Sequence, residues 1–256
     1  LYWVFTTDCP EGNYAEMRKS GALSAEDDHA GATKGMMAAM SDYRVWALFL
    51  VYGACFGVEL TINNIAAIYF FDRFDLSLAT AGVIAGLFGL MNIFARTLGG
   101  VFSDKFAAKG GLSGRVKFLF FALFVEGIAL VAFSMMDALV IAVAVMIVFS
   151  LFVQMSEGAT FGIVPFVNRK ALGSVAGIVG AGGNAGAVAA GFLFKSEALT
   201  YQEGLFYLGC AVIVCSFAAL AVRFSAATQA EEQQRFDRAH AERMGTSGSG
   251  QPVPAE

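Results

Sequence analysis

Long stretches without a charged residue alternate with short polar segments along the chain. Four of these stretches span 19 to 24 residues, and two more are interrupted by one acid each, Glu59 in 45–71 and Glu126 in 118–136. About 20 apolar residues in an α-helix cross the hydrocarbon core of a membrane. The pattern therefore predicts six transmembrane helices, at about 45–71, 77–102, 117–136, 138–164, 172–195 and 203–224.

The composition agrees with a membrane protein. Hydrophobic residues make up 57% of the 256 residues and charged residues only 15%, whereas about a quarter of a soluble domain is charged. We therefore expect an all-α, multi-pass protein embedded in a lipid bilayer. It is predicted to have a cytoplasmic loop over 1–44, a six-helix bundle over 45–224 and a flexible cytoplasmic tail over 225–256.

Basic residues concentrate in alternate loops. Lys105, Lys109, Arg115 and Lys117 lie between the second and third predicted helices, and the loop between the fourth and fifth holds another basic pair. The positive-inside rule places these loops, and with them both termini, in the cytoplasm. Two six-helix halves build many secondary transporters. Because residue 1 is leucine, we expect this chain to be one half of a longer protein.

The fifth predicted helix is rich in glycine and alanine. Its segment Gly180–Ala185 has the spacing G-x-G-x-x-A of a dinucleotide loop, but that loop requires a preceding strand, which this chain does not offer. Small residues stacked at every fourth position instead allow close helix packing in lipid. Gly182 and Gly183 are expected to leave room for a small ligand or for helix sliding. Asn184 is expected either to hydrogen-bond between helices or to donate to a substrate.

A single arginine follows the charge-free part of the second predicted helix. Burying an arginine in a bilayer costs roughly 2.5–3.5 kcal/mol or more, so Arg96 should face a cavity or a partner. Three alternatives follow: binding of a small anion, whose oxygens suit the planar guanidinium, an ion pair with Glu59, Glu126 or Glu157, or snorkelling to the cytoplasmic surface. The same three acids are candidates either for proton transfer or for interhelical hydrogen bonds.

Other chemistries find little support. The four cysteines show no C-x-x-C spacing, and both histidines lie in the polar ends of the chain. The sequence has no H-E-x-x-H motif and no serine next to a histidine inside a predicted helix. We therefore expect no metal, no cofactor, no nucleic-acid partner and no enzymatic activity.

The loop after the second predicted helix resembles a known signature. Gly100–Lys105 (GVFSDK), followed by Arg115–Lys117 (RVK), is similar to the G-x-x-x-D-(R/K) … R-(R/K) motif between the second and third helices of each half of the major facilitator superfamily. Ten residues separate Asp104 from Arg115, more than is usual in that motif. The glycine would let two helices pack closely, and the aspartate would pair with a basic group or a helix end.

A more specific resemblance rests on several segments together. The chain from about Phe5 to Gly209 resembles the C-terminal half of the high-affinity nitrate transporters of algae, plants and fungi, in the nitrate/nitrite porter family. Thr6–Asn13 resembles the central loop that precedes that half. The segments that carry the resemblance are Val58–Asn64 (VELTINN), Tyr69–Phe74 (YFFDRF), Phe88–Gly100 (FGLMNIFARTLGG), Gly158–Gly173 (GATFGIVPFVNRKALG) and Gly180–Gly186 (GAGGNAG).

The resemblance implies roles for particular residues. Arg96 stands where the family has its nitrate-coordinating arginine, and Gly180–Gly186 where it has a glycine-rich nitrate signature that lines the pore and allows the helices to slide. Tyr52 matches a tyrosine that touches the anion in bacterial relatives. Glu157 departs from the cysteine expected in plant members, which leaves its role in coupling open.

The resemblance also implies a function for the longer protein. Such proteins are proton-coupled nitrate symporters of the plasma membrane that serve nitrate uptake and assimilation, and some require a single-span accessory protein. Without its N-terminal half this chain is not expected to transport. The alternatives are a porter for another small anion, such as nitrite or a carboxylate, and a non-transporting receptor or interaction subunit.

Overall fold

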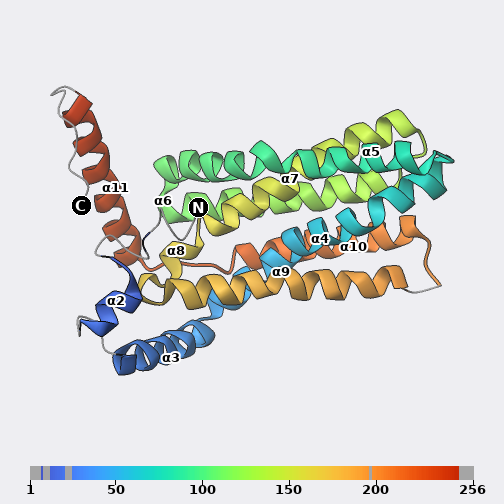
Figure 1. The fold of residues 1–256 in the computed structure, drawn as a ribbon. Helices are drawn as coiled ribbons and strands as arrows, with labels where there is room; N and C mark the ends of the chain where they lie inside the picture. The colour runs from blue at the N-terminus through green and yellow to red at the C-terminus, as the bar shows by residue number, and fades with distance from the viewer. Residues whose placement is uncertain (1–6, 8–11, 21–24, 196–197, 248–256) are drawn as a thin grey trace.

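The structure is a computed structural model, and it describes residues 7, 12–20, 25–195 and 198–247. Most of the predicted loop motif Thr6–Asn13 therefore lies outside the described residues. The bundle helices are α4 (Tyr43–Phe74), α5 (Leu78–Leu90), α6 (Asn92–Ser134), α7 (Leu139–Phe161), α9 (Leu172–Lys195) and α10 (Tyr201–Ala219). They run side by side in Figure 1. Shorter or peripheral elements are α2 (Tyr14–Lys19), α3 (Ala25–Ser41), α8 (Val164–Val167), the 3-10 turn η1 (Arg169–Ala171) and α11 (Ala226–Ser247).

One of the membrane segments contains a reversal of the chain. Within the described residues, five segments are long and apolar enough to span a membrane, and one of them, Leu78–Ser134, has 57 residues. Gly111 has a left-handed φ of 57° inside it. Residues on either side of Gly111 lie next to each other, since the rings of Phe106 and Phe118 are 5.2 Å apart. The segment is therefore a hairpin that crosses twice, and the chain makes the six predicted crossings.

The hydrophobic pattern predicts the helix boundaries to within a few residues, apart from this hairpin. The second predicted helix, 77–102, is interrupted at Met91, which separates α5 from α6. Ser77 caps the start of α5, because its side chain accepts a hydrogen bond from the Thr80 N–H. At the start of α10, Thr200 and Glu203 form a reciprocal capping box. These local signals place helix ends where the apolar runs end.

The entry of the chain into the bundle is held by an ion pair. Asp42 caps α4 and accepts hydrogen bonds from the Arg44 backbone N–H and from its guanidinium. Partial burial alone raises the pKa of the Asp42 carboxyl, but the hydrogen bonds and charge of Arg44 outweigh it, so this pKa lies below its ordinary value. Arg44 also donates to the Val167 carbonyl. The start of α4 is thus tied to the chain that leads into α9.

Helix α4 forms the centre of the bundle and contacts α5, α7, α9 and α10. Backbone contacts at glycines bring α4 and α9 together. A Cβ on Gly57 would lie 2.7 Å from the Ala187 backbone nitrogen, and one on Gly186 would lie 2.6 Å from the Gly53 Cα. The small residues of the fifth predicted helix therefore pack against a neighbouring backbone, as expected for helices in lipid.

A second glycine contact joins α6 to α7. A Cβ on Gly99 would lie 2.8 Å from the Met155 Cα, and one on Gly158 would lie 3.0 Å from the Arg96 carbonyl carbon. A Cβ on Gly100 would meet nothing within 4 Å. The Gly100 backbone nitrogen does border α7, since a Cβ on Gly158 would lie 3.2 Å from it. The absence of a Cβ is therefore required at Gly99 and Gly158, whereas a side chain at Gly100 would point away from α7.

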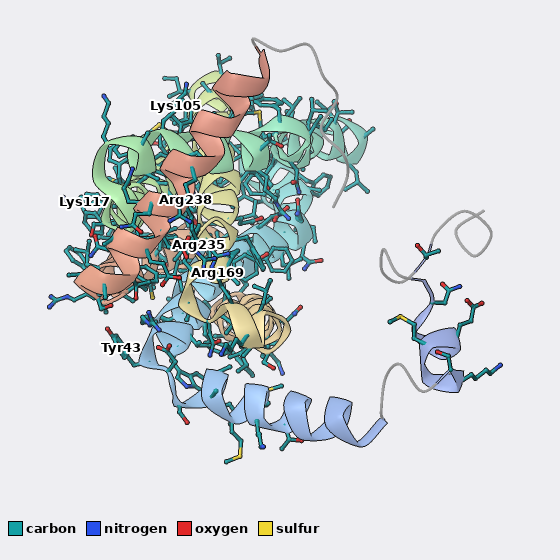
Figure 2. The ribbon with its side chains drawn as sticks, turned by 90° about the vertical axis from the view of Figure 1, so that its left-hand side faces the viewer. Tyr43, Lys105, Lys117, Arg169, Arg235 and Arg238 are labelled. Atoms are coloured by element: carbon teal, nitrogen blue, oxygen red, sulfur yellow. The ribbon has the colours of Figure 1, made fainter. Side chains whose placement is uncertain are left out.

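Helix α11 and the basic loops gather at one end of the bundle. In Figure 1, α11 crosses the end at which α2 and α3 also lie. Figure 2 looks onto that end and labels Lys105, Lys117 and Arg169 on it, together with Arg235 and Arg238 of α11. The sequence assigns residues 225–256 to the tail, and the described part of that tail includes this helix. The two predicted basic loops are therefore on the same side of the protein.

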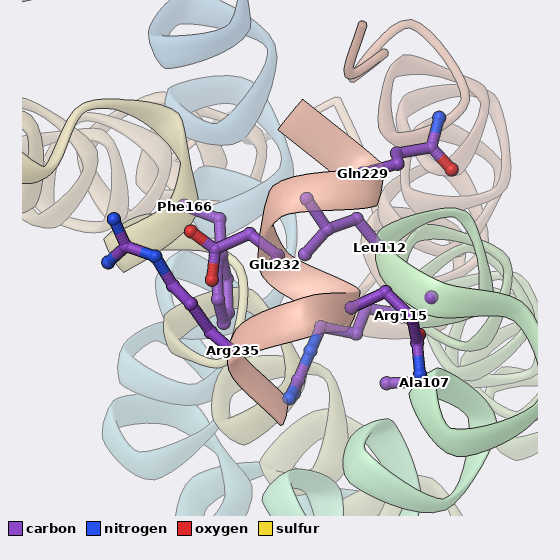
Figure 3. A pocket seen from close by; sticks show the side chains of 9 residues that line it. Ala107, Leu112, Arg115, Phe166, Gln229, Glu232 and Arg235 are labelled. Carbon is purple, nitrogen blue, oxygen red and sulfur yellow. The ribbon is translucent and has the colours of Figure 1, made fainter. Parts of the chain in front are cut away.

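Specific contacts hold α11 against the bundle. The Arg169 Nε donates to a Glu232 oxygen at 3.0 Å, and Ser113 donates to the Gln229 side-chain oxygen at 3.1 Å. A cavity of about 260 Å³ remains between α11, the α6 hairpin and α8, with Arg115 and Phe166 among the residues that line it (Figure 3). The tail helix thus bridges two connections of the bundle, the α6 hairpin and the turn before α9.

We expect Glu232→Gln to loosen α11 from the bundle. The substitution removes the charge that faces Arg169, so α11 of the full-length protein should be cleaved faster by an added protease. The melting temperature should change little, because a partly exposed pair contributes about 1 kcal/mol or less. Glu231→Gln is the matched control, since Glu231 pairs with Arg235 within α11. Equal cleavage rates in wild type and Glu232→Gln would contradict the expectation.

Candidate functional site

Arg96 lies in the first half of α6 and is bonded to two carboxylates. Its Nη2 donates to a Glu59 oxygen at 3.0 Å and also pairs with Glu157. The Arg96 side chain is 38% exposed, whereas those of Glu59 and Glu157 are 6% and 1% exposed. The guanidinium is therefore partly exposed, whereas the two carboxylates that bind it are buried.

Of the three alternatives for Arg96, the structure shows the ion pair. Glu59 belongs to α4 and Glu157 to α7, so the guanidinium joins three helices. It reaches into the bundle and does not snorkel to the surface. The position of Arg96 alone no longer requires an anion, because buried carboxylates already explain it. Anion binding has to be argued from the open side of the guanidinium and from its remaining donors.

Polar side chains surround this pair. The Asn92 amide donates to the second Glu59 oxygen at 3.0 Å. The Gln154 side-chain oxygen lies 3.4 Å from the Arg96 Nη2. Asn92 lies one turn before Arg96 on α6, and Gln154 lies three residues before Glu157 on α7, which puts each on the same helix face as its neighbour. The charged pair is thus embedded in a polar cluster.

Aromatic rings line the same region. Tyr52 is 6% exposed and stacks on Phe56 with ring centroids 5.1 Å apart, and Phe161 approaches its edge at 5.0 Å. The Arg96 guanidinium carbon lies 6.0 Å from the Phe56 ring centre, within range of a cation–π contact. Tyr52, which was predicted to contact the anion, therefore stacks on the ring that borders Arg96.

The predicted glycines of α9 divide into two groups. Gly182, Gly183 and Gly186 face α4, and a Cβ on Gly183 would lie 3.1 Å from the Tyr52 ring. Gly183 therefore makes space for the aromatic pair beside Arg96. A Cβ on Gly180 would meet nothing within 4 Å, and Asn184 is exposed and has no hydrogen bond to another described residue. The interhelical bond considered for Asn184 is thus not formed within this bundle.

Two predicted groups lie apart from the Arg96 cluster. Asp104 and Arg115 pair at 2.6 Å across the α6 hairpin, and Arg115 also covers the Phe166 ring at 5.1 Å. These contacts belong to the end of the bundle that α11 crosses. Glu126 is fully buried in the second half of α6, and neither carboxyl oxygen has a hydrogen-bond partner among the described residues. Glu126 is therefore a buried acid that takes no part in the hydrogen bonds around Arg96.

Three residues around Arg96 were not predicted from the sequence: Asn92, Gln154 and Phe56. Asn92 and Gln154 stand three or four residues from Arg96 and Glu157, on the same helix faces. That spacing was an available signal, since residues one turn apart on a helix are neighbours. Phe56 lacked a signal, because one phenylalanine among 25 in an apolar chain is unremarkable.

Several curated proteins are similar to most of the chain. It is 44% identical over 214 residues to the high affinity nitrate transporter 2.5 of Arabidopsis thaliana, which covers 83% of this chain and 42% of that protein. It is 40% identical over 223 residues to the high-affinity nitrate transporter 2.3 of Oryza sativa subsp. japonica, covering 86% of this chain and 42% of that protein.

This chain belongs to the nitrate transporter family. A bacterial member, the nitrate/nitrite transporter NrtP of Picosynechococcus, is 39% identical over 150 residues, covering 57% of this chain and 27% of that protein. No family model matches the chain, and no solved structure matches it. The chain spans less than half the length of these two plant nitrate transporters. Its fold is that of one six-helix half of a major facilitator superfamily transporter.

Proposed function

We propose that the protein containing this chain transports nitrate across a membrane, with Arg96 as the cation that binds it. The observation that carries this proposal is the half-open guanidinium, 38% exposed beside carboxylates that are almost fully buried. Relatives named nitrate transporters support nitrate as the substrate. Tyr52, Asn184, Gly182 and Gly183 are proposed to line the binding site.

Proton coupling is suggested by the number of buried carboxyl groups that share one cation. Two carboxyls, Glu59 and Glu157, share one guanidinium, and a second buried negative charge is costly without a second cation. One of the two carboxyls is therefore expected to carry a proton when nitrate occupies Arg96. Nitrate and a carboxylate compete for the same donors, so anion binding and proton uptake are linked. Glu126, buried without a partner among the described residues, is a further candidate for carrying a proton.

Energetics favour coupling to more than one proton. Moving one nitrate into a compartment that is negative inside is opposed by about 2.3 kcal/mol per 100 mV. One proton cancels that charge, and a second one makes the membrane potential drive the uptake. The three buried acids of this half offer enough carboxyls for such a ratio.

Glu157→Gln is expected to flatten the pH dependence of nitrate uptake. Glutamine resembles the protonated acid, so nitrate affinity should no longer fall as the external pH rises. Uptake of labelled nitrate by the full-length protein, measured as KM over a range of external pH, checks this. Asp72→Asn is the matched control, because Asp72 is an exposed carboxylate at a helix end. A pH profile of Glu157→Gln that follows the wild type excludes Glu157 as the coupling acid.

The missing half supplies the rest of the pathway in this proposal. Asn184 is exposed on α9 and would face the N-terminal half. The glycine contacts between α4 and α9, together with Gly100, Gly180 and the Asp104–Arg115 pair, would accommodate rocking between the halves. Both termini of the chain are proposed to lie in the cytoplasm, with the protein in the plasma membrane. A single-span accessory protein is a further proposed partner.

Uptake of labelled nitrate by the full-length protein in proteoliposomes tests the function. A proton gradient, acid outside, should increase the uptake, and unlabelled nitrite should compete more strongly than a carboxylate such as acetate. Stronger competition by a carboxylate would identify the porter for another anion. Absence of anion uptake from protein that is folded and inserted would favour the receptor or interaction subunit.

A further inference from the structure

Gln154 is a buried amide that faces Arg96 from α7. Its side chain is 0% exposed, and its oxygen lies 3.4 Å from the Arg96 Nη2. A guanidinium has only donors, so the amide atom that faces it has to be the oxygen. The orientation of this amide follows from chemistry, although oxygen and nitrogen look alike in most structures. The Gln154 Nε2 therefore points away from the guanidinium.

Two buried donors beside each other have no acceptor. Neither the Gln154 Nε2 nor the Arg96 Nε has a hydrogen-bond partner within the described part of the chain. Buried donors are rarely left unpaired, because each loses its bonds to water without replacement. Both Glu157 oxygens are also buried there without a hydrogen bond, although one of them pairs with Arg96. The two unpaired donors, one on Gln154 and one on a guanidinium that is 38% exposed, point to an acceptor that is not part of this chain.

We infer that Gln154 donates a hydrogen bond to bound nitrate and helps to distinguish nitrate from nitrite. This inference rests on the proposed function. Nitrate has three oxygens in a plane. The Nε and Nη2 edge of Arg96 can hold two of them when nitrate displaces a carboxylate. The amide beside Nη2 is then placed to donate to the third oxygen.

Nitrite lacks that third oxygen. The Arg96 edge binds both of its oxygens, and the Gln154 Nε2 gains no partner. A site that is built to donate to a substrate oxygen discriminates against an analogue without it, because the buried donor stays unpaired. Gln154 therefore acts on selectivity, whereas Arg96 acts on both anions.

A purely structural role for Gln154 gives a different expectation. If the amide only holds Arg96 in place through its oxygen, its loss displaces the guanidinium and weakens nitrate and nitrite alike. The ratio of the two affinities separates the two roles. The absolute affinity for nitrate alone would not separate them.

The experiment uses Gln154→Met in the full-length transporter, because methionine fills a similar volume without a donor or acceptor. The KM of labelled nitrate and the inhibition constant of nitrite against that uptake are measured in proteoliposomes. We expect the nitrate KM to rise about tenfold or more, as for loss of a hydrogen bond to a charged group. The nitrite inhibition constant should change less than about twofold. Ser150→Ala is the control. Ser150 lies one turn before Gln154 on α7, and its buried hydroxyl donates to the carbonyl of Phe88 on α5. This substitution should leave the ratio of the nitrate and nitrite constants unchanged.

The outcomes separate this inference from the function on which it rests. Equal changes for both anions, or no change for either, overturn the role of Gln154 and leave nitrate transport standing. Wild-type protein that takes up no nitrate overturns the proposed function, and the inference with it. If Gln154→Met does not reach the membrane, Gln154→Leu decides by the same ratio. Leucine lacks the amide donor and, unlike a carboxyl, can neither donate through a bound proton nor compete with the anions for Arg96.

Discussion

Arg96→Lys in the full-length protein is expected to raise the KM for nitrate at least about tenfold, or to abolish uptake, while the protein still inserts and folds. Arginine offers a flat edge of two donors that matches two oxygens of one anion, and lysine offers a point charge without that fork. A loss of one bidentate, charge-assisted contact corresponds to about 1.5–3 kcal/mol.

Lysine is the informative substitution because it keeps the positive charge. Removing the charge would leave Glu59 and Glu157 buried without their cation, which costs about 3–5 kcal/mol and destabilises the bundle. A lysine at this position still faces both carboxylates, so a loss of uptake reports on anion binding.

Uptake of labelled nitrate in proteoliposomes, normalised to inserted protein, measures the effect of Arg96→Lys. Arg73→Lys is the matched control, since Arg73 lies in the last turn of α4 and pairs with Asp137, not with Glu59 or Glu157. That control should keep the wild-type KM. Unchanged uptake and KM in Arg96→Lys would remove Arg96 from the binding site.

Gly186→Ala is expected to destabilise the protein by about 1–3 kcal/mol, the usual cost of overpacking a tight contact. The new methyl group would lie 2.6 Å from the Gly53 Cα and closer still to the Gly53 carbonyl oxygen. Neither helix can relieve this contact by a rotamer change, because both sides are backbone. The helices α4 and α9 have to separate, which also disturbs the aromatic pair beside Arg96.

Gly180→Ala is the matched control on the same helix. A Cβ there meets nothing within 4 Å, and alanine favours a helix by up to about 1 kcal/mol over glycine. The melting temperature of the purified full-length protein should fall clearly for Gly186→Ala and stay the same or rise for Gly180→Ala. Equal melting temperatures would show that the contact between α4 and α9 is looser than described. A loss of nitrate uptake in Gly180→Ala without loss of stability would indicate that Gly180 contacts the other half.

Some features of this protein follow from the order of its residues alone. Apolar runs longer than about 20 residues have to form helices in a bilayer, because lipid offers no hydrogen bonds to an exposed backbone. The crossings and the membrane class are therefore readable from the sequence. The identity of Arg96 as an unusual cation is also readable, since burial of an isolated charge is unfavourable wherever the helix lies.

The partners of that cation were decided by the tertiary structure. Three acids were equally plausible from the sequence, and the fold selects Glu59 and Glu157 and leaves Glu126 apart. The same holds for the glycines, since a Cβ on Gly99 or Gly186 would collide with a neighbouring helix, while one on Gly100 or Gly180 in the same runs would meet nothing within 4 Å. Sequence spacing states which residues share a helix face. It does not state which neighbour that face meets, because this depends on how helices far apart in the chain rotate and pack against each other.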